Sequence, residues 1–221
     1  MNYFSEQDIR DIVIRVLASA GEAPRRDAPG KSIPVEISAR HVHLTKAAVE
    51  TLFGKGYQLT PKRDLSQPGQ YLCAERVKLV TAKGQLDNVA ILGPVRQENQ
   101  VELSLTDARI LGVEAPIRLS GDLEGAADVL IVSNLGVVTA PKSAIVAKAH
   151  IHMTPADAKD YSVRDGEHVD IRMGTDRPVT LNDVIVRVRE DYALAVHIDF
   201  DEANAAQVRG SNITGHLIKS R

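Results

Sequence analysis

Several residue patterns that would point to common functional classes are missing from this sequence. Its 221 residues contain no tryptophan and one cysteine, Cys73, which excludes an internal disulfide and a zinc ribbon built on cysteine pairs. The net charge of -2 provides no basic surface of the kind that nucleic acids and anionic membranes select. No apolar run approaches the roughly 20 residues of a membrane-spanning helix. We therefore expect a cytosolic protein that binds neither nucleic acid nor membrane.

Nucleotide-binding fingerprints and acyl-enzyme signatures are absent as well. The GKG at residues 54–56 fits neither a P-loop nor a dinucleotide motif. No Gly-x-Ser-x-Gly elbow or activated Cys-His pair is visible, and we expect Cys73 to be a small buried apolar side chain. With 43% hydrophobic and 25% charged residues, the composition is that of a globular protein with one large domain or two small ones.

The first 22 residues have the pattern of an amphipathic helix. Ser5 is the expected N-cap of a helix over residues 4–20, with aliphatic residues from Ile9 to Leu17 on one face. Residues 23–33 are rich in Gly, Pro, Ala and charge, which is typical of a linker. Such a helix either docks on a separate partner or packs on its own domain, and the sequence leaves both open.

Beyond the linker the chain contains two related halves. Placing His41 over His150 brings RHVHLTKAAVETLFG over AHIHMTPADAKDYSV, each a short β run followed by a helix. Thr154 as cap and Pro155 at the first helical position mark the second helix start. Alternating β-branched runs, and then a strand ending in a short helix, follow in both halves. This order predicts a mainly β protein with short helices, built from two small β-barrels.

We expect the first barrel repeat over residues 34–149 and the second over residues 150–221. The strand at residues 36–46 could pack in its own half or with the other half. The first half carries about 14 more residues after its His-x-His motif, and we expect the loop KGYQLTPKRDLSQPGQ, residues 55–70, to account for them.

Potential metal ligands collect at the duplicated positions. They are His41, His43 and Glu102 in the first half, and His150, His152 and His197 in the second. Residues i and i+2 of a strand point to the same face, so each His-x-His pair can converge on one ion. Three protein ligands are the number found in catalytic zinc sites that keep an open position. Cobalt, nickel, copper or iron would also fit, and half-buried histidines without metal are the alternative for a single pair. The duplication favours two metals.

A second constellation is GPVRQENQVE, residues 93–102. Gly93-Pro94 ends a strand, and Arg96 follows in a turn six residues before Glu102. A guanidinium beside a metal centre could hold a phosphate or carboxylate through two parallel hydrogen bonds. Taken alone, the same arginine would be a surface charge.

The stretches ISARHVHLT, GPVRQENQVELSLTDARILG and AHIHMTPADA, in this order, resemble the phosphate propanoyltransferase family, the phosphotransacylases of bacterial microcompartments. The resemblance runs over nearly all of residues 33–210. It implies a duplicated pair of interlocked six-stranded β-barrels with strand exchange between the halves. It also implies a dinuclear centre of two Zn²⁺ per chain, and reversible transfer of a short acyl group, propanoyl or acetyl, between CoA and inorganic phosphate.

Site residues follow from the resemblance by position. His41, His43 and Glu102 would bind one zinc, His150, His152 and His197 the other, and Arg96 would be the catalytic residue that binds phosphate. Two departures from the family pattern bear on acyl preference and CoA binding. Ala149 stands where the family usually has arginine, and QEN stands in the arginine loop where small polar residues are common.

The resemblance also implies partners. Residues 1–22 look like an encapsulation peptide that would bind shell or core enzymes in the lumen of a bacterial microcompartment, and a homodimer is expected. CoA and acyl-CoA would be substrates with phosphate and acyl phosphate. Lys62, Arg63, Lys142 and Lys148 could contact the CoA phosphates or could be solvated surface charges.

Three functions fit these patterns. In a phosphate acyltransferase, phosphate attacks the thioester directly, since it is already anionic and needs positioning and charge stabilisation more than a strong base. In a dinuclear zinc hydrolase such as a thioesterase, metal-bound hydroxide attacks, and Arg96 would have less purpose. A non-enzymatic metal-binding scaffold would have closed four-ligand sites, whereas each half offers three ligands.

Overall fold

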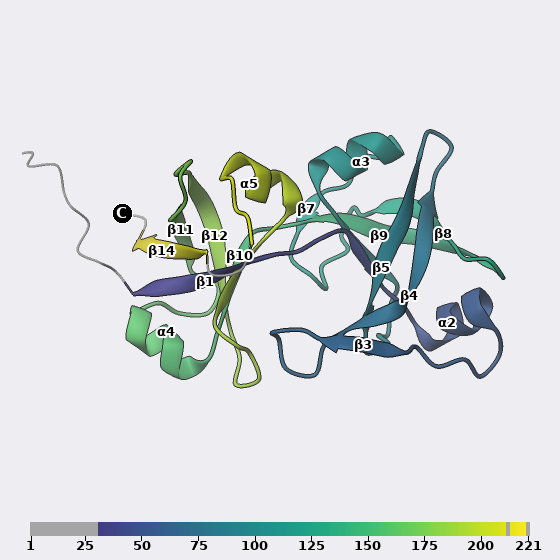
Figure 1. Ribbon diagram of the computed structural model, residues 1–221, viewed down its shortest axis with the longest axis horizontal. Coiled ribbons are helices and arrows are strands. Elements are labelled where there is room, and N and C mark those ends of the chain that lie inside the picture. Colours follow the sequence, from purple (N-terminus) through teal and green to yellow (C-terminus); the bar gives the residue numbers. More distant parts are fainter. Residues whose placement is uncertain (1–30, 211–212, 220–221) are drawn as a thin grey trace, which may run out of the picture. The chain divides into compact units, whose positions relative to one another are not determined.

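A computed structural model describes residues 31–210 and 213–219 of the protein (Figure 1). The amphipathic helix expected over residues 4–20 and its linker as far as residue 30 lie outside the described residues. The described part is mainly β with a few short helices, and its strands form two closed barrels. None of the described helices is long and apolar enough to cross a bilayer.

The first barrel is a closed ring of six strands. Around the ring these are β4 (Tyr71–Val80), β5 (Gln85–Gly93), β2 (His41–His43), β6 (Gln100–Leu103), β9 (Val137–Ala147) and β8 (Ala127–Val132), which pairs back to β4. Two short strands lie beside the ring: β3 (Pro61–Asp64) pairs with β4, and β7 (Ile117–Arg118) pairs with β9.

The second barrel is also closed and six-stranded. Its order is β1 (Ser32–Ile37), β13 (Ala195–Ile198), β10 (His150–Met153), β12 (Thr180–Val188), β11 (His168–Met173) and β14 (Thr214–Lys219), which pairs back to β1. The expected pair of six-stranded barrels is therefore confirmed.

Strand β1 provides the exchange between the halves. It precedes the first half in the chain but pairs with β13 and β14 of the second barrel. The strand expected at residues 36–46 is in fact two strands, because β1 ends at Ile37 in the second barrel and β2 begins at His41 in the first. The first residues of the expected first repeat over residues 34–149 therefore belong to the second barrel, because they lie in β1. Figure 1 shows β1 at the left among the strands of the second barrel.

The strand register turns both His-x-His motifs outward from their barrels. Val42 pairs with Val101 and Ile91, and all three are fully buried in the core of the first barrel. Side chains alternate along a strand, so the flanking histidines face the outside of that barrel. In the second barrel, Ile151 pairs with the buried Val196, with the same consequence for its flanking histidines.

Four short helices follow the ligand-bearing strands. They are α2 (Lys46–Phe53), α3 (Leu105–Leu111), α4 (Pro155–Tyr161) and α5 (Phe200–Ala205). Thr154 caps α4 by accepting a hydrogen bond from the backbone N–H of Asp157, with Pro155 at the helix start as expected. Ser104 and Asp199 cap α3 and α5 in the same way, so the predicted strand-helix order of both halves is confirmed.

Two local expectations have different outcomes. The prediction of a loop over residues 55–70 is wrong at residues 61–64. These residues form β3, which pairs with β4 at the edge of the sheet, where a first residue such as Pro61 is tolerated. Cys73 is fully buried in the first core, as expected, and burial raises the pKa of its thiol to about 11.

Candidate active site

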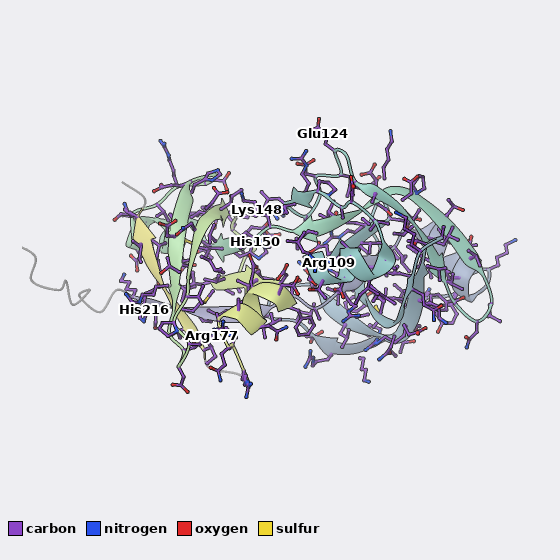
Figure 2. All side chains as sticks on the ribbon, turned by 90° about the horizontal axis from the view of Figure 1, so that it is seen from above. Arg109, Glu124, Lys148, His150, Arg177 and His216 are labelled. Atoms are coloured by element: carbon purple, nitrogen blue, oxygen red, sulfur yellow. The ribbon has the colours of Figure 1, made fainter. Side chains whose placement is uncertain are left out.

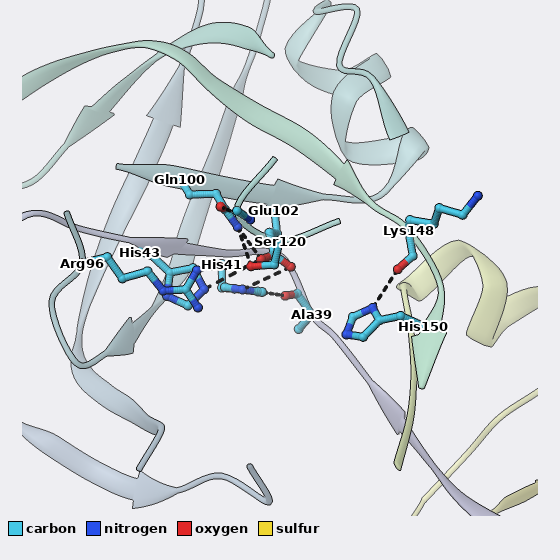
Figure 3. Close-up of polar contacts among 10 residues, drawn as sticks. Ala39, His41, His43, Arg96, Gln100, Glu102, Ser120, Lys148 and His150 are labelled. Carbon is cyan, nitrogen blue, oxygen red and sulfur yellow. Dashed lines mark hydrogen bonds and ion pairs between the residues drawn. The ribbon is translucent and has the colours of Figure 1, made fainter. Parts of the chain in front are cut away.

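The six predicted ligands lie on the outer faces of the two barrels, yet they are largely shielded from solvent. Five of them are less than 9% exposed, and the side chain of His197 is 13% exposed. Burial lowers the pKa values of His150 and His197 on the second barrel, and the negative charge of Glu102 on the first barrel acts against this lowering. Figure 3 shows His41 and Glu102 from one barrel with His150 from the other. The two ligand sets are therefore near enough for their charges to interact, and together they form one candidate site.

The first ligand set is compact. Glu102 pairs with His41 across β2 and β6, and its Oε2 lies 3.6 Å from Nε2 of His41. Its other oxygen, Oε1, lies 3.8 Å from Nε2 of His43. One ligand atom from each residue falls within 4.8 Å of the others, which is a spacing that a single ion could bridge.

The second ligand set consists of three imidazoles. His150 pairs with His197 across β10 and β13, at the register that His41 and Glu102 occupy in the first barrel. The ring centroids of His150, His152 and His197 lie 4.6 to 5.0 Å apart, and one nitrogen of each lies within 4.8 Å of the others.

Backbone carbonyls orient the first histidine of each set in the same way. Nδ1 of His41 is 2.7 Å from the carbonyl oxygen of Ala39, and Nδ1 of His150 is 2.8 Å from that of Lys148 (Figure 3). A carbonyl only accepts hydrogen bonds, so Nδ1 carries a proton, and in the neutral ring the lone pair is on Nε2. Partners of this kind fix the ring of a metal-binding histidine.

Burial keeps most of these imidazoles neutral. It lowers the pKa of His43 to about 3, that of His197 to about 3 and that of His152 to about 2, with neighbouring histidines adding repulsion. Neutral imidazoles have the free lone pair that metal binding requires.

His41 and Glu102, in contrast, stabilise each other's charged forms. Burial alone lowers the pKa of His41, but the charge and hydrogen bonding of Glu102 outweigh it and leave the pKa raised. Burial alone would raise the pKa of Glu102, yet the two histidines and Ser120 hold it well below its usual range. Glu102 is therefore an ionised carboxylate, as a metal ligand must be.

Several buried ring nitrogens fit a metal site. Among the described residues, Nδ1 of His43 and both ring nitrogens of His152 are buried without a hydrogen-bond partner. A buried polar group without a partner costs about 1–3 kcal/mol, which a metal bond would offset. Two imidazoles with a carboxylate, and three imidazoles, are donor sets that suit zinc.

Arg96 lies beside the first ligand set, on the loop between β5 and β6. Its backbone N–H donates to the carbonyl of Leu44 at 2.9 Å, and its Nη1 donates to Oγ of Ser120 at 3.2 Å. Burial lowers the pKa of Arg96, Arg187 acts in the same direction, and Glu102 acts against both. An arginine remains charged under such shifts, so the site holds a half-buried cation next to the ligands.

The chain is similar to known proteins over most of its length. The family model for phosphate propanoyltransferase matches residues 34–209. A phosphate propanoyltransferase of Alkaliphilus metalliredigens (strain QYMF) is 47% identical over 97% of this chain and 99% of its own length. One from Leptotrichia buccalis is 53% identical over 84% of this chain and 87% of its own. The chain belongs to the phosphate propanoyltransferase family. It is accordingly an enzyme, and a non-enzymatic scaffold no longer competes.

Two further side chains of this phosphate propanoyltransferase site, Gln100 and Ser120, were not predicted from the sequence. Gln100 donates to Oε1 of Glu102 at 2.6 Å and to Oγ of Ser120 at 2.8 Å, and its own Oε1 accepts from the backbone of Gly121. Gln100 could have been found, because it precedes Glu102 by two residues on the same face of a strand. Ser120 reaches the site from the segment after β7, and no local pattern indicates it.

The basic residues considered for CoA lie in different surroundings. Lys62 and Arg63 are exposed on β3, and Lys142 is exposed on β9. Lys148 pairs with Asp183, although its backbone carbonyl contacts His150. In Figure 2, Lys148 and His150 are labelled close together, with His216 on the far side of the second barrel. Of these four, only Lys148 lies next to a ligand.

Proposed function

We propose that the protein transfers a short acyl group, propanoyl or acetyl, reversibly between CoA and inorganic phosphate at a dinuclear metal centre, with two zinc ions per chain as the leading assignment. The observation that supports this proposal most is the presence of two buried three-ligand sets, with the half-buried cation of Arg96 beside the first of them. Family membership supports the reaction, and the donor sets support the metals.

In this proposal Arg96 binds phosphate and holds it for direct attack on the thioester carbon. The P–O⁻ oxygen forms the new C–O bond, the C–S bond breaks, and CoA leaves as a thiolate. Holding two reactants in attack geometry can contribute about 7–11 kcal/mol. When bound, the metal would act as a Lewis acid towards the developing oxyanion. Ser120, which accepts from Arg96, keeps the guanidinium in place.

Direct transfer agrees with the state of the one cysteine in the chain. The one cysteine, Cys73, is fully buried in the first core, and its pKa of about 11 keeps the thiol protonated. An acyl-enzyme needs an accessible activated nucleophile. Initial-rate patterns test this step, since parallel ping-pong lines would contradict direct transfer.

The decisive experiment follows acyl phosphate and free thiol from a panel of acyl-CoAs, with and without phosphate. We expect acyl phosphate and thiol in equal amounts, and thiol release that depends on phosphate. Thiol release without phosphate would favour the thioesterase alternative, in which hydroxide attacks. Metal content per chain, measured on the same active preparation, should be two, and a lower value would contradict the paired centre.

The variant Arg96→Gln tests phosphate binding by Arg96 separately from metal binding. We expect kcat/KM for phosphate to fall about 100-fold or more, because a charge-assisted bidentate contact is lost, while metal content is unchanged. Arg177→Gln is the control, since Arg177 is exposed on the second barrel and is separate from His150 in Figure 2. Near-normal phosphate kinetics in Arg96→Gln would contradict its role.

The proposal extends to location and assembly. Residues 1–22, with their apolar stripe, are proposed to direct the enzyme to a microcompartment lumen by binding shell or core enzymes. A fusion of this segment to a fluorescent reporter should become punctate in compartment-forming cells, whereas the same fusion carrying Ile12→Glu should stay diffuse. A diffuse wild-type fusion would contradict targeting. The homodimer rests on the family resemblance and is tested by light scattering of the full chain.

A further inference from the structure

A second arginine lies at the site without an assigned role. Arg187 is on β12, where it pairs with His152 of β10 in a parallel ladder. Paired residues of neighbouring strands point to the same face, and the preceding pair, Ile151 with Val186, is fully buried in the second core. Arg187 therefore leaves the barrel on the same side as His152, towards the site.

Tyr192 connects this arginine to the second ligand set. Its ring stacks on the imidazole of His152, with centroids 3.9 Å apart and 25° between the planes. The guanidinium carbon of Arg187 lies 5.9 Å from the centroid of the Tyr192 ring, and that of Arg189 lies 5.1 Å from it. Cation–π contacts of this length hold a guanidinium near a ring without neutralising it.

The two arginines beside Tyr192 differ in their partners. Arg189 is exposed and forms two hydrogen bonds to the carboxylate of Asp191, at 2.8 and 2.9 Å. Arg187 is half-buried, and no carboxylate among the described residues pairs with it. A half-buried cation without an anion has lost part of its hydration and lacks a compensating charge.

The charge of Arg187 also acts on Arg96, which comes from the other barrel. This charge contributes to lowering the pKa of Arg96 and the pKa values of all three histidines of the second set. Two cations that approach from opposite barrels destabilise each other unless an anion lies between them. A phosphate dianion has enough oxygens to accept hydrogen bonds from both guanidinium groups.

We propose that Arg187 is a second phosphate-binding residue, which grips the phosphoryl group from the second barrel while Arg96 grips it from the first. The inference rests on the proposed function, because it assumes phosphate as the acyl acceptor. The ligand is a phosphoryl oxyanion, and we assign it to inorganic phosphate or acyl phosphate and not to the diphosphate of CoA. Tyr192 keeps the Arg187 side chain turned towards His152.

The test compares Arg187→Gln with Arg189→Gln in the metal-loaded full-length enzyme. Titration calorimetry with inorganic phosphate, without acyl-CoA, should show binding weakened about 10- to 100-fold in Arg187→Gln, as expected for a lost charge-assisted contact. Arg189→Gln should bind phosphate within about twofold of the wild type, because its charge is already paired. Metal content of both variants should match the wild type. Unchanged phosphate binding in Arg187→Gln would overturn the proposal.

A second arm separates the two sources of phosphoryl groups. Propanoyl-pantetheine carries the thioester but no phosphate, so its turnover reports on inorganic phosphate alone. The rise in the KM for phosphate caused by Arg187→Gln should persist with this substrate, and Arg187→Lys should restore part of the affinity. A defect seen with propanoyl-CoA and absent with propanoyl-pantetheine would assign Arg187 to CoA and overturn our assignment. Should the wild type form no acyl phosphate, the proposed function itself would fail, which is a different result.

Discussion

A single amide orients the carboxylate of the first ligand set. The side chain of Gln100 is 3% exposed, and its amide orientation is fixed because its Oε1 accepts the backbone N–H of Gly121. Its NH₂ group then donates to Glu102 and to Ser120. Contacts that orient a ligand are worth about 10- to 100-fold in metal affinity.

We therefore expect Gln100→Met to weaken the first of two metal-binding steps by about 10- to 100-fold while the second set keeps its affinity. Competition with a chromophoric chelator measures both steps. Gln85→Met is the control, because Gln85 is exposed at the start of β5. Equal weakening of both metals would show that Gln100 supports the fold in general.

At the scale of elements, the duplicated helices α3 and α5 differ in whether an arginine pairs with the acidic third residue. Asp107, the third residue of α3, is paired with Arg40, whose Nε lies 3.3 Å from its Oδ1. Glu202 is the third residue of α5, and the position that matches Arg40 is Ala149. Burial raises the pKa of Glu202 to about 7, with repulsion from Asp199 adding to it. Because Ala149 replaces the arginine, Glu202 lacks the cationic partner that Asp107 has in Arg40.

This difference predicts a pH dependence of stability. Glu202 holds its proton up to about pH 7 when folded but loses it near the ordinary value of about 4.3 when unfolded. The folded state binds more protons in this window, so stability falls as the pH rises from about 4.3 to about 7. Glu202→Gln removes the effect and keeps an oxygen that can accept from the backbone of Asp199.

We expect Glu202→Gln to stabilise the protein by about 1–2 kcal/mol at pH 8 and by much less at pH 4.5. Urea unfolding at both pH values measures this difference. Asp107→Asn is the matched control in the other half, and it should destabilise at pH 8 because it leaves Arg40 without its carboxylate. A Glu202→Gln effect that is the same at both pH values would contradict an ionisation origin.

At the scale of the whole molecule, the sequence contains the parts of the site but not how they meet. Strand alternation was enough to predict that His41 and His43 share a face, and the repeat was enough to add Glu102 and His197. Contacts between the barrels depend on tertiary packing, which leaves no local pattern. Arg187 is a similar case, since its neighbours on β12 have the pattern of an ordinary strand and only the fold places it beside His152. The course of β1 was left open for the same reason.

The extra residues of the first half show this most clearly, because they serve the second ligand set. Gln67 is 5% exposed and forms two hydrogen bonds with the backbone of Ala193, at 2.9 and 3.2 Å. Its Nε2 also lies 3.4 Å from Nε2 of His197. The adjacent Ser66 donates to Glu36, whose carboxylate lies 3.8 Å from Nδ1 of His197. One loop of the first repeat thus contacts His197, a predicted metal ligand on the other barrel.

We expect Gln67→Ala to weaken metal binding by the second set about tenfold and to leave the first set unchanged, which is the reverse of Gln100→Met. Chelator competition on both single variants and on the double variant measures this, and the two effects should add because the variants orient different ligands. Lys62→Ala, on the exposed β3 before the same loop, should change neither step. If Gln67→Ala weakened the first set instead, the insertion would not be the support of His197, and its place between the barrels would need another reason.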